Sequence, residues 1–150
     1  YFLLIIYYHY VFSIKIFMMI RILKSKLHRA TVTSTHLDYE GSCAIDSALL
    51  DAAEISEYEM IHIYNLNNGE RFTTYAIKSE RGSGEITLNG AAAHKGKKND
   101  LIIICTYVDI LRKEVKKHSP KLVYFKENSN YVDKIKSSIP MQKKNNVVSI

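Results

Sequence analysis

Gly41 and Ser42 are the first residues of this chain whose types and order suggest chemistry, because together they allow a reaction on the backbone itself. A serine hydroxyl attacks the preceding carbonyl only where the peptide is strained, and glycine tolerates unusual backbone angles without a Cβ in the way. The attack would turn the amide into an ester. Elimination would then free the upstream carboxylate, and hydrolysis of the resulting dehydroalanine would leave a pyruvoyl group. The pair alone does not predict this reaction, because most Gly-Ser pairs form simple turns.

A second group of chemically useful side chains lies in RFTTYAI, residues 71–77. Arg71 offers a planar fork of donors suited to a carboxylate, and Tyr75 offers a phenol that can donate a proton. Residues four apart on a regular strand point to one side, so these two suit a shared pocket. Thr74 points the other way on an ideal strand and needs a twist or bulge to reach the same place. The alternatives are an exposed charge at a hairpin end and tyrosine packing on a neighbouring strand.

The segment NGAAA, residues 89–93, has the composition of an anion-binding loop. Its small side chains leave the backbone N–H groups of Gly90, Ala91 and Ala92 free to approach a carboxylate. A tight turn into a close-packed segment is the alternative.

The elements that must position these residues are mostly strands. Residues 20–35 are rich in β-branched types, and two alternating runs within residues 60–77 flank Asn68-Gly69, a pair preferred in tight primed hairpin turns. Asp46 is a natural N-cap for a short helix that buries one apolar face. That face comprises Leu49, Leu50 and Ala53.

Three further strands are expected: a short one between a Gly-punctuated turn and Asn89-Gly90, one at residues 100–110 and one at residues 121–125. The middle one, DLIIICTYVDI, is almost continuously apolar, which is typical of a strand buried on both faces. With so little helix, the pattern predicts a small β-barrel and excludes a doubly wound fold.

Length and charge place the chain among small globular proteins. Its 150 residues suffice for one domain, and 21 basic against 15 acidic residues give a net charge of +6, with many of the lysines after Arg112. We interpret these lysines as a solvated surface and tail, because no aromatic-flanked basic motif indicates a nucleic-acid partner. Cys43 and Cys105 belong to no metal-binding or disulfide pattern, so we expect a reducing compartment and no metal.

The first residues, 1–17, read differently from the rest, as an apolar run interrupted by His9 and Lys15. The run is of marginal length for a membrane span and lacks the basic start and cleavage site of a secretory signal. We interpret it as a non-native or untranslated leader ahead of Met18 and Met19, rather than as a membrane anchor.

Five motifs in the chain resemble, in order and spacing, the pyruvoyl-dependent aspartate 1-decarboxylases. The resemblance runs from about Met18 to Phe125 and continues weakly through residues 137–142. The motifs are KLHRATVT, LDYEGSCAID, NGERFTTYAI, ERGSG and NGAAAH.

This resemblance implies self-cleavage between Gly41 and Ser42, with Ser42 becoming a pyruvoyl group that forms a Schiff base with the substrate amine, so that no external cofactor is required. It also implies decarboxylation of L-aspartate to β-alanine for pantothenate and coenzyme A synthesis in the cytoplasm. The implied fold is a double-psi β-barrel over residues 18–130, assembled as a homotetramer with sites between subunits. Residues 131–150 would then be a basic tail. Whether a maturation factor triggers cleavage is left open.

The resemblance further assigns roles to single residues. Tyr75 matches the proton donor, while Lys26, Arg71, Thr74, Gly90, Ala91 and Ala92 match the substrate-binding set. His28, Tyr64 and Asn89 match supporting positions. Three residues depart from the usual pattern, since Ser25 and Glu54 stand where glycine is common and Tyr64 where tryptophan is common.

Three other functions remain open at this point. The first is a pyruvoyl decarboxylase for another small amino acid, although Arg71 favours an acidic substrate. The second is an unprocessed β-barrel that binds a ligand or a partner without catalysis. The third is a membrane-anchored protein that uses residues 1–17.

Overall fold

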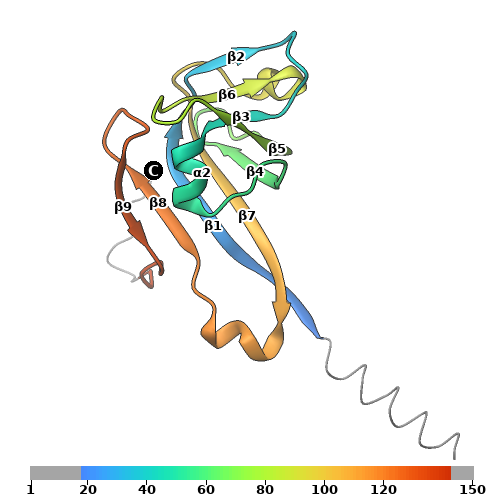
Figure 1. Ribbon diagram of the computed structural model, residues 1–150, viewed down its shortest axis with the longest axis vertical. Helices are drawn as coiled ribbons and strands as arrows, with labels where there is room; N and C mark the ends of the chain where they lie inside the picture. The colour runs from blue at the N-terminus through green and yellow to red at the C-terminus, as the bar shows by residue number, and fades with distance from the viewer. Residues whose placement is uncertain (1–17, 143–150) are drawn as a thin grey trace, which may run out of the picture.

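The computed structural model of the protein describes residues 18–142, so residues 1–17, interpreted above as a leader, and residues 143–150 of the predicted tail lie outside the described residues. Nine strands in this part of the chain pair in the order β2-β6-β3-β5-β4-β7-β1-β8-β9 (Figure 1). The architecture is mainly β with a few short helices, which confirms the predicted class and fits a small β-barrel. The double-psi topology, the homotetramer and the domain limits stay predictions.

The two longest strands of the sheet, β1 (Met19–Thr31) and β7 (Leu101–Leu111), are antiparallel neighbours. They extend beyond the other strands toward a 3-10 helix, η2 (Arg112–Lys117) (Figure 1). The prediction that β7 is buried on both faces holds only for residues 102–106, apart from a half-buried Ile103. From Tyr107 onward the strand is exposed or half-buried. The reason is that this half of β7 pairs with β1 alone beyond the end of β4.

The predicted hairpin consists of β4 (Met60–Asn65) and β5 (Arg71–Ser79) in an unbroken antiparallel register. Its turn is not the tight primed turn that Asn68-Gly69 suggested. A loop of residues 66–70 joins the strands, and of that pair only Gly69 has a positive φ, at +77°. The Asn68 side chain instead accepts a hydrogen bond of 2.9 Å from the backbone N–H of Glu70, which is a local alternative to the primed turn.

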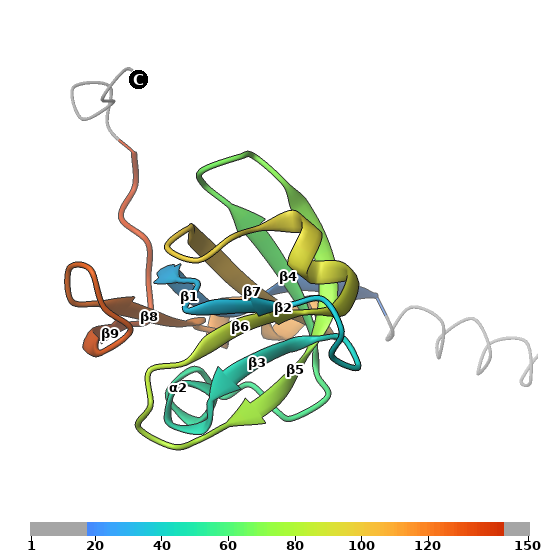
Figure 2. The same ribbon diagram turned by 90° about the horizontal axis from the view of Figure 1, so that it is seen from above.

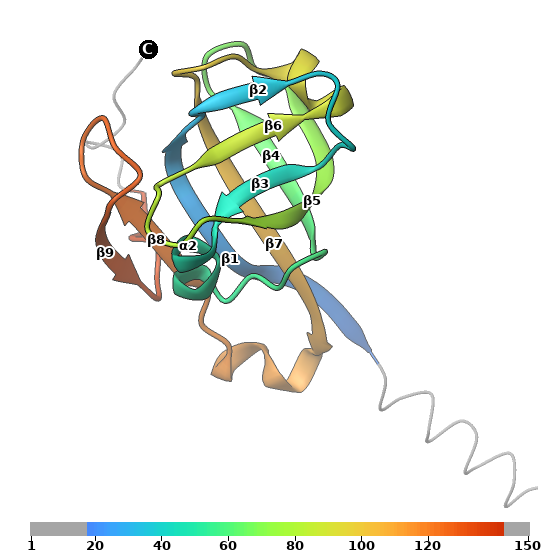
Figure 3. The same cartoon turned by 45° about the horizontal axis from the view of Figure 1, so that its top comes forward.

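Three short strands form the layer that carries the Gly41–Ser42 segment: β2 (Ser34–His36), β3 (Cys43–Asp46) and β6 (Ile86–Asn89). β3 lies between β6, to which it is antiparallel, and β5, to which it is parallel (Figure 3). The segment 37–42 therefore connects β2 to β3 at an end of this layer. Seen from above, β2 crosses β1 and β7, with β6 and β3 on the side of α2 and β4 on the other side (Figure 2).

The helix α2 (Ser47–Ala53) matches the sequence prediction. The Asp46 carboxylate caps it by accepting a 2.8 Å hydrogen bond from the N–H of Ala48, and the helix buries the predicted face of Leu49, Leu50 and Ala53. Burial alone would raise the pKa of Asp46. Because backbone N–H groups of Gly84, Gly82 and Ala48 donate to its carboxylate, the pKa lies below its usual value.

The interior is filled by aliphatic side chains from both layers, and ten of the largest are completely buried leucines and isoleucines. These are Leu27, Ile45, Leu50, Ile61, Ile63, Ile86, Leu88, Ile102, Ile104 and Leu122. The predicted strand β8 (Lys121–Phe125) pairs in parallel with β1. A further strand, β9 (Val132–Lys136), pairs with β8 and was not predicted, because all five of its residues are exposed and leave no alternating pattern.

Candidate active site

The Gly41–Ser42 peptide is held in an unusual backbone conformation. Gly41 has a φ of +103° and Ser42 a φ of +81°, a value that side-chain-bearing residues adopt only at a cost of about 1–2 kcal/mol. Ser42 is 4% exposed, and its hydroxyl oxygen is buried with no hydrogen-bond partner among the described residues. A strained peptide next to an unengaged hydroxyl is the arrangement that an attack on the Gly41 carbonyl requires.

Gly90 and Asn89 hold this peptide from the side of β6. A Cβ on Gly90 would lie 2.9 Å from the Cα of Gly41 and 3.2 Å from the carbonyl oxygen of Tyr39, so only glycine fits there. The backbone N–H of Asn89 donates a 3.0 Å hydrogen bond to the carbonyl of Ser42. Ala91 and Ala92 continue from Gly90 into the 3-10 helix η1 (Gly90–Lys95).

Tyr75 approaches the same peptide from β5. Cys43 pairs with Ala76, which places Tyr75 beside the start of β3, and a Cβ added to Gly41 would lie 3.9 Å from the Tyr75 hydroxyl. The structure thus gathers Gly41, Ser42 and Tyr75 in one place, together with Asn89 and Gly90.

Arg71, Tyr64 and Lys26 form a second group on the outer face of the sheet. The guanidinium carbon of Arg71 lies 3.9 Å from the centre of the Tyr64 ring, and the Tyr64 hydroxyl lies 2.9 Å from that of Tyr107. Burial raises the pKa of the Cys105 thiol, while the charges of Lys26 and Arg71 act in the opposite direction. Both cations therefore lie within electrostatic reach of Cys105.

The two groups are not brought together within one chain. Arg71 precedes Tyr75 by four residues on a regular strand, which separates their Cα atoms by about 13 Å. Arg71 also stacks toward Tyr64 on β4, away from Ser42. The Tyr64 ring holds the Arg71 guanidinium on the β4 side of β5, whereas Ser42 precedes β3 on the other side of β5.

Thr74 and His28 differ from Arg71 and Tyr75 in their surroundings. The β4–β5 register has no bulge, so the half-buried Thr74 faces the side of β5 opposite Arg71 and Tyr75. His28 lies on β1 and packs against Tyr124 with ring centres 5.1 Å apart. Burial, with the charges of Lys26 and Arg29, lowers the pKa of His28.

In the described part of the chain, buried side-chain nitrogen and oxygen atoms without a hydrogen-bond partner occur only at predicted site residues. They are Nδ1 of His28, Oγ of Ser42 and Oδ1 of Asn89. Leaving such an atom unpaired costs about 1–3 kcal/mol, so a fold normally avoids it unless the site has another use. This coincidence supports a functional site at these positions.

The cysteine next to Ser42 does not compete with it as a nucleophile. Burial raises the pKa of the Cys43 thiol to about 12, which keeps it protonated at neutral pH. Ser42 remains the candidate nucleophile of this segment, because it directly follows Gly41 and its buried hydroxyl has no hydrogen-bond partner among the described residues.

Ser25, one of the departures noted in the sequence, has a structural partner. Its side chain is completely buried, and its hydroxyl lies 2.6 Å from that of Thr106, within hydrogen-bonding distance. Sequence reasoning did not single out Tyr107 or His62, which contact each other on the face that carries Arg71. Cys105 and Tyr107 are two residues apart on β7, which places them on one face of the strand and could have pointed to Tyr107. Because almost the whole run is apolar, this alternation did not stand out in the sequence.

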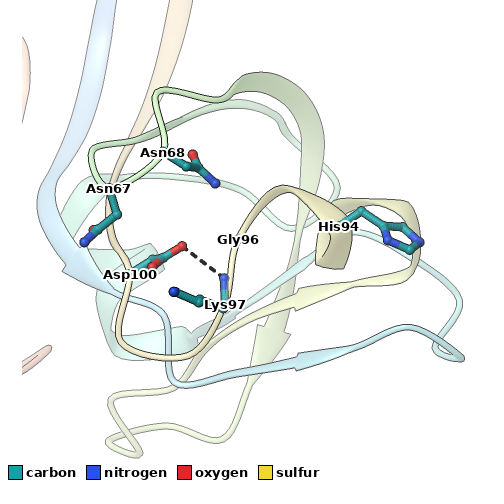
Figure 4. A pocket seen from close by; sticks show the side chains of 6 residues that line it. All are labelled: Asn67, Asn68, His94, Gly96, Lys97 and Asp100. Atoms are coloured by element: carbon teal, nitrogen blue, oxygen red, sulfur yellow. Dashed lines mark hydrogen bonds between the residues drawn. The ribbon is translucent and has the colours of Figure 1, made fainter.

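A separate polar cavity of about 410 Å³ opens at one end of the barrel, between the β4–β5 loop and the start of β7 (Figure 4). It is lined by Asn67, Asn68, His94, Gly96, Lys97 and Asp100. The Asp100 carboxylate there accepts 2.8 and 3.1 Å hydrogen bonds from the Asn65 side chain and the Lys97 N–H. These hydrogen bonds give the polar residues of the cavity a role in stabilising the loops. Because Ser42 does not line the cavity, we place the candidate reactive site at Ser42 and not in the cavity.

Within residues 18–142, none of the helices combines the length and the apolar character that crossing a bilayer requires.

Comparisons with known proteins agree with the site chemistry. The sequence profile of the family described as aspartate decarboxylase matches residues 18–132. A protein of Nitrosococcus oceani named aspartate 1-decarboxylase is 55% identical over 125 residues, which cover 83% of this chain and 98% of the relative. A protein of the same name from Ralstonia pickettii is 60% identical over 107 residues, covering 71% of this chain and 89% of the relative.

Proposed function

The chain belongs to the aspartate decarboxylase family, and on this premise we propose that it converts L-aspartate to β-alanine and carbon dioxide with a pyruvoyl group made from its own Ser42. The product would serve pantothenate and coenzyme A synthesis. The observation that carries the proposal is the strained, buried Gly41–Ser42 peptide with its unpartnered serine hydroxyl.

The surroundings of Ser42 fit the formation of a pyruvoyl group there. The hydroxyl is free to attack the Gly41 carbonyl, and the positive φ of Ser42 is strain that breaking the peptide would release. The Asn89 N–H would keep the Ser42 carbonyl in place during the cut. The pyruvoyl group supplies an electron sink for the loss of carbon dioxide, so the proposal needs no external cofactor.

The chain's own side chains would then bind the substrate and move a proton. Tyr75 is the proposed donor to the product carbon, because its hydroxyl lies closest to the Gly41–Ser42 peptide from β5. Arg71 and Lys26 would bind the substrate carboxylates, with the backbone N–H groups of Gly90, Ala91 and Ala92 on the opposite side. Thr74 stays in the proposal as a contact from the half-buried face of β5.

The separation of Ser42 from Arg71 supports sites between neighbouring subunits. We propose a homotetramer in which one chain supplies Ser42, Tyr75 and the 89–92 segment, and its neighbour supplies Arg71 and Tyr64. His28, which has an unpartnered ring nitrogen, would support the site from that neighbour as well. Two cysteines that do not pair with each other fit a cytoplasmic enzyme.

Denaturing intact mass spectrometry of protein expressed from Met18 tests the proposal. We expect two fragments that meet between Gly41 and Ser42, the larger one blocked by a pyruvoyl group at its start. The Ser42→Ala variant should give a single uncut chain without decarboxylase activity, because it lacks the attacking hydroxyl. The Tyr75→Phe variant should still be cut and should turn over poorly.

The outcomes separate the rival functions. A cut or active Ser42→Ala variant would contradict the mechanism. If the wild-type chain stays intact after prolonged warm incubation, with or without cell extract, this result would favour the alternative of an unprocessed β-barrel that binds a ligand or a partner without catalysis. A cut enzyme that prefers another small amino acid over aspartate and glutamate in direct competition would correct the substrate.

A further inference from the structure

Tyr107 lies at the centre of an aromatic cluster, formed with Tyr64 and His62, that the proposed reaction does not yet use. Its hydroxyl is 2.9 Å from that of Tyr64. Its ring meets the His62 ring edge-on, with centres 5.1 Å apart and planes at 85°. The cluster joins β7 to β4, so Tyr107 connects the longest strand pair to the strand that supports Arg71.

Arg71 rests on this cluster, and within the described part of the chain its side-chain donors have no hydrogen-bond or ion-pair partner. Its guanidinium carbon lies 3.9 Å from the centre of the Tyr64 ring. A guanidinium stacked on a ring keeps its N–H edge free, because its donors point outward in its own plane. No carboxylate among residues 18–142 forms an ion pair with Arg71.

The ring that supports Arg71 is fixed through its hydroxyl. A half-buried tyrosine ring can turn about its side-chain bonds unless its polar end is also held. The bond to Tyr107 provides that hold from the neighbouring strand. This hydrogen bond, helped by burial, raises the pKa of Tyr107, so the Tyr107 hydroxyl stays protonated at neutral pH.

We propose that Tyr107 is a positioning residue for substrate recognition: its hydroxyl orients the Tyr64 ring, and the ring presents the N–H edge of Arg71 to a substrate carboxylate. The inference rests on the proposed function, since it takes Arg71 as the carboxylate-binding side chain. Orientation before binding lowers the entropy that binding must remove. Because the contact is the same before and during reaction, its loss should appear in KM rather than in kcat.

The test compares Tyr107→Phe, Tyr64→Phe and the double variant, each of which removes a hydroxyl and keeps the ring. We expect each single variant to raise KM for aspartate by about three- to tenfold, as the loss of one hydrogen bond predicts, with kcat within about twofold. The double variant should be no worse than either single variant, because both remove the same bond. Tyr131→Phe, at a tyrosine that is 63% exposed, is the matched control and should not change KM.

Calorimetric binding of succinate, a dicarboxylate without the amine, provides a readout that does not require turnover. Its affinity should fall by the same factor as KM rises. Additive effects of the two single variants, a loss confined to kcat, or unchanged succinate affinity would each overturn the inference. A wild-type protein that binds succinate through this cluster but does not decarboxylate aspartate would overturn only the proposed function.

Discussion

At the scale of single residues, the reactive peptide depends on a close contact between two backbones. Gly90 touches Gly41 more closely than any side chain would allow, and its own φ is +56°. Glycine at position 90 therefore does more than form a turn. It allows the end of β6 to pack closely against the segment that contains the proposed cleavage site.

Gly90→Ala should slow self-cleavage by about tenfold or more, because a Cβ there must displace the Gly41 backbone. The rate of appearance of the two fragments, followed by mass spectrometry, measures the effect. Gly69→Ala is the matched control: Gly69 has a φ of +77° but nothing within 4 Å of an added Cβ, so cleavage should keep its wild-type rate. Equal rates in the two variants would contradict a constraining role for Gly90.

The sequence predicts which residues form the proposed reactive site, but not their backbone conformation. Gly41-Ser42, Tyr75 and Asn89-Gly90 were predicted from their motifs, and the structure places them together. The positive φ of Ser42 was not predictable, because serine has no local preference for it. Ser42 contacts the 89–90 segment, which lies more than forty residues away in the sequence, so no local pattern reveals this conformation.

At the scale of elements, the end of α2 explains the departure at Glu54. This residue is the C-cap of the helix and has a φ of +55°, a conformation that favours glycine. Its carboxylate lies 2.7 Å from the Lys121 ammonium, and hydrogen bonding to that ammonium lowers the pKa of Glu54. Because the pair is largely exposed, it offsets only part of the backbone strain.

Glu54→Gly should therefore raise the melting temperature by about 2 °C, since the relief of strain exceeds the added freedom of the unfolded chain. Thermal unfolding in the uncut Ser42→Ala background measures this on a single species. Glu57→Gly is the control, because Glu57 also pairs with a lysine, at 3.2 Å, but has no positive φ. A lower melting temperature for Glu54→Gly would show that the ion pair dominates.

Elements with a clear alternation or a cap were predictable, and those without were not. The helix was recognised from Asp46 and its apolar face, and the β4–β5 hairpin from its two alternating runs. β9 was missed because every residue in it is exposed, so pairing with β8 is the only interaction that defines it. The loop 66–70 was mistaken for a tight turn because side-chain hydrogen bonds fix its shape.

At the scale of the whole molecule, the proposed site needs two chains. Co-expression of Ser42→Ala with Arg71→Ala tests this, because each variant lacks one half of the site. If the halves come from different chains, random mixing should restore about a quarter of the wild-type activity at low aspartate. Activity no higher than that of Arg71→Ala alone would place both halves in one chain.

Ser42→Ala mixed with Tyr75→Phe is the control for this experiment. Tyr75 lies beside Gly41 of its own chain, so the two variants damage the same half of the site and should not complement each other. The proposed homotetramer could not be derived from periodicity, because the residues of an interface look like ordinary surface residues in the sequence.

The place of the Gly41–Ser42 bond between β2 and β3 has a consequence for the life of the protein. The part before the bond contributes β1 and β2, which are hydrogen-bonded to β7, β8 and β6, and it buries Leu27, Ala30 and Val32 in the interior. A cut barrel is therefore two peptides held only by non-covalent contacts. Once such a barrel unfolds, its peptides must find each other again by diffusion, so refolding becomes concentration-dependent. The intact precursor folds as one chain. After maturation, an unfolded protein could no longer refold in this unimolecular way.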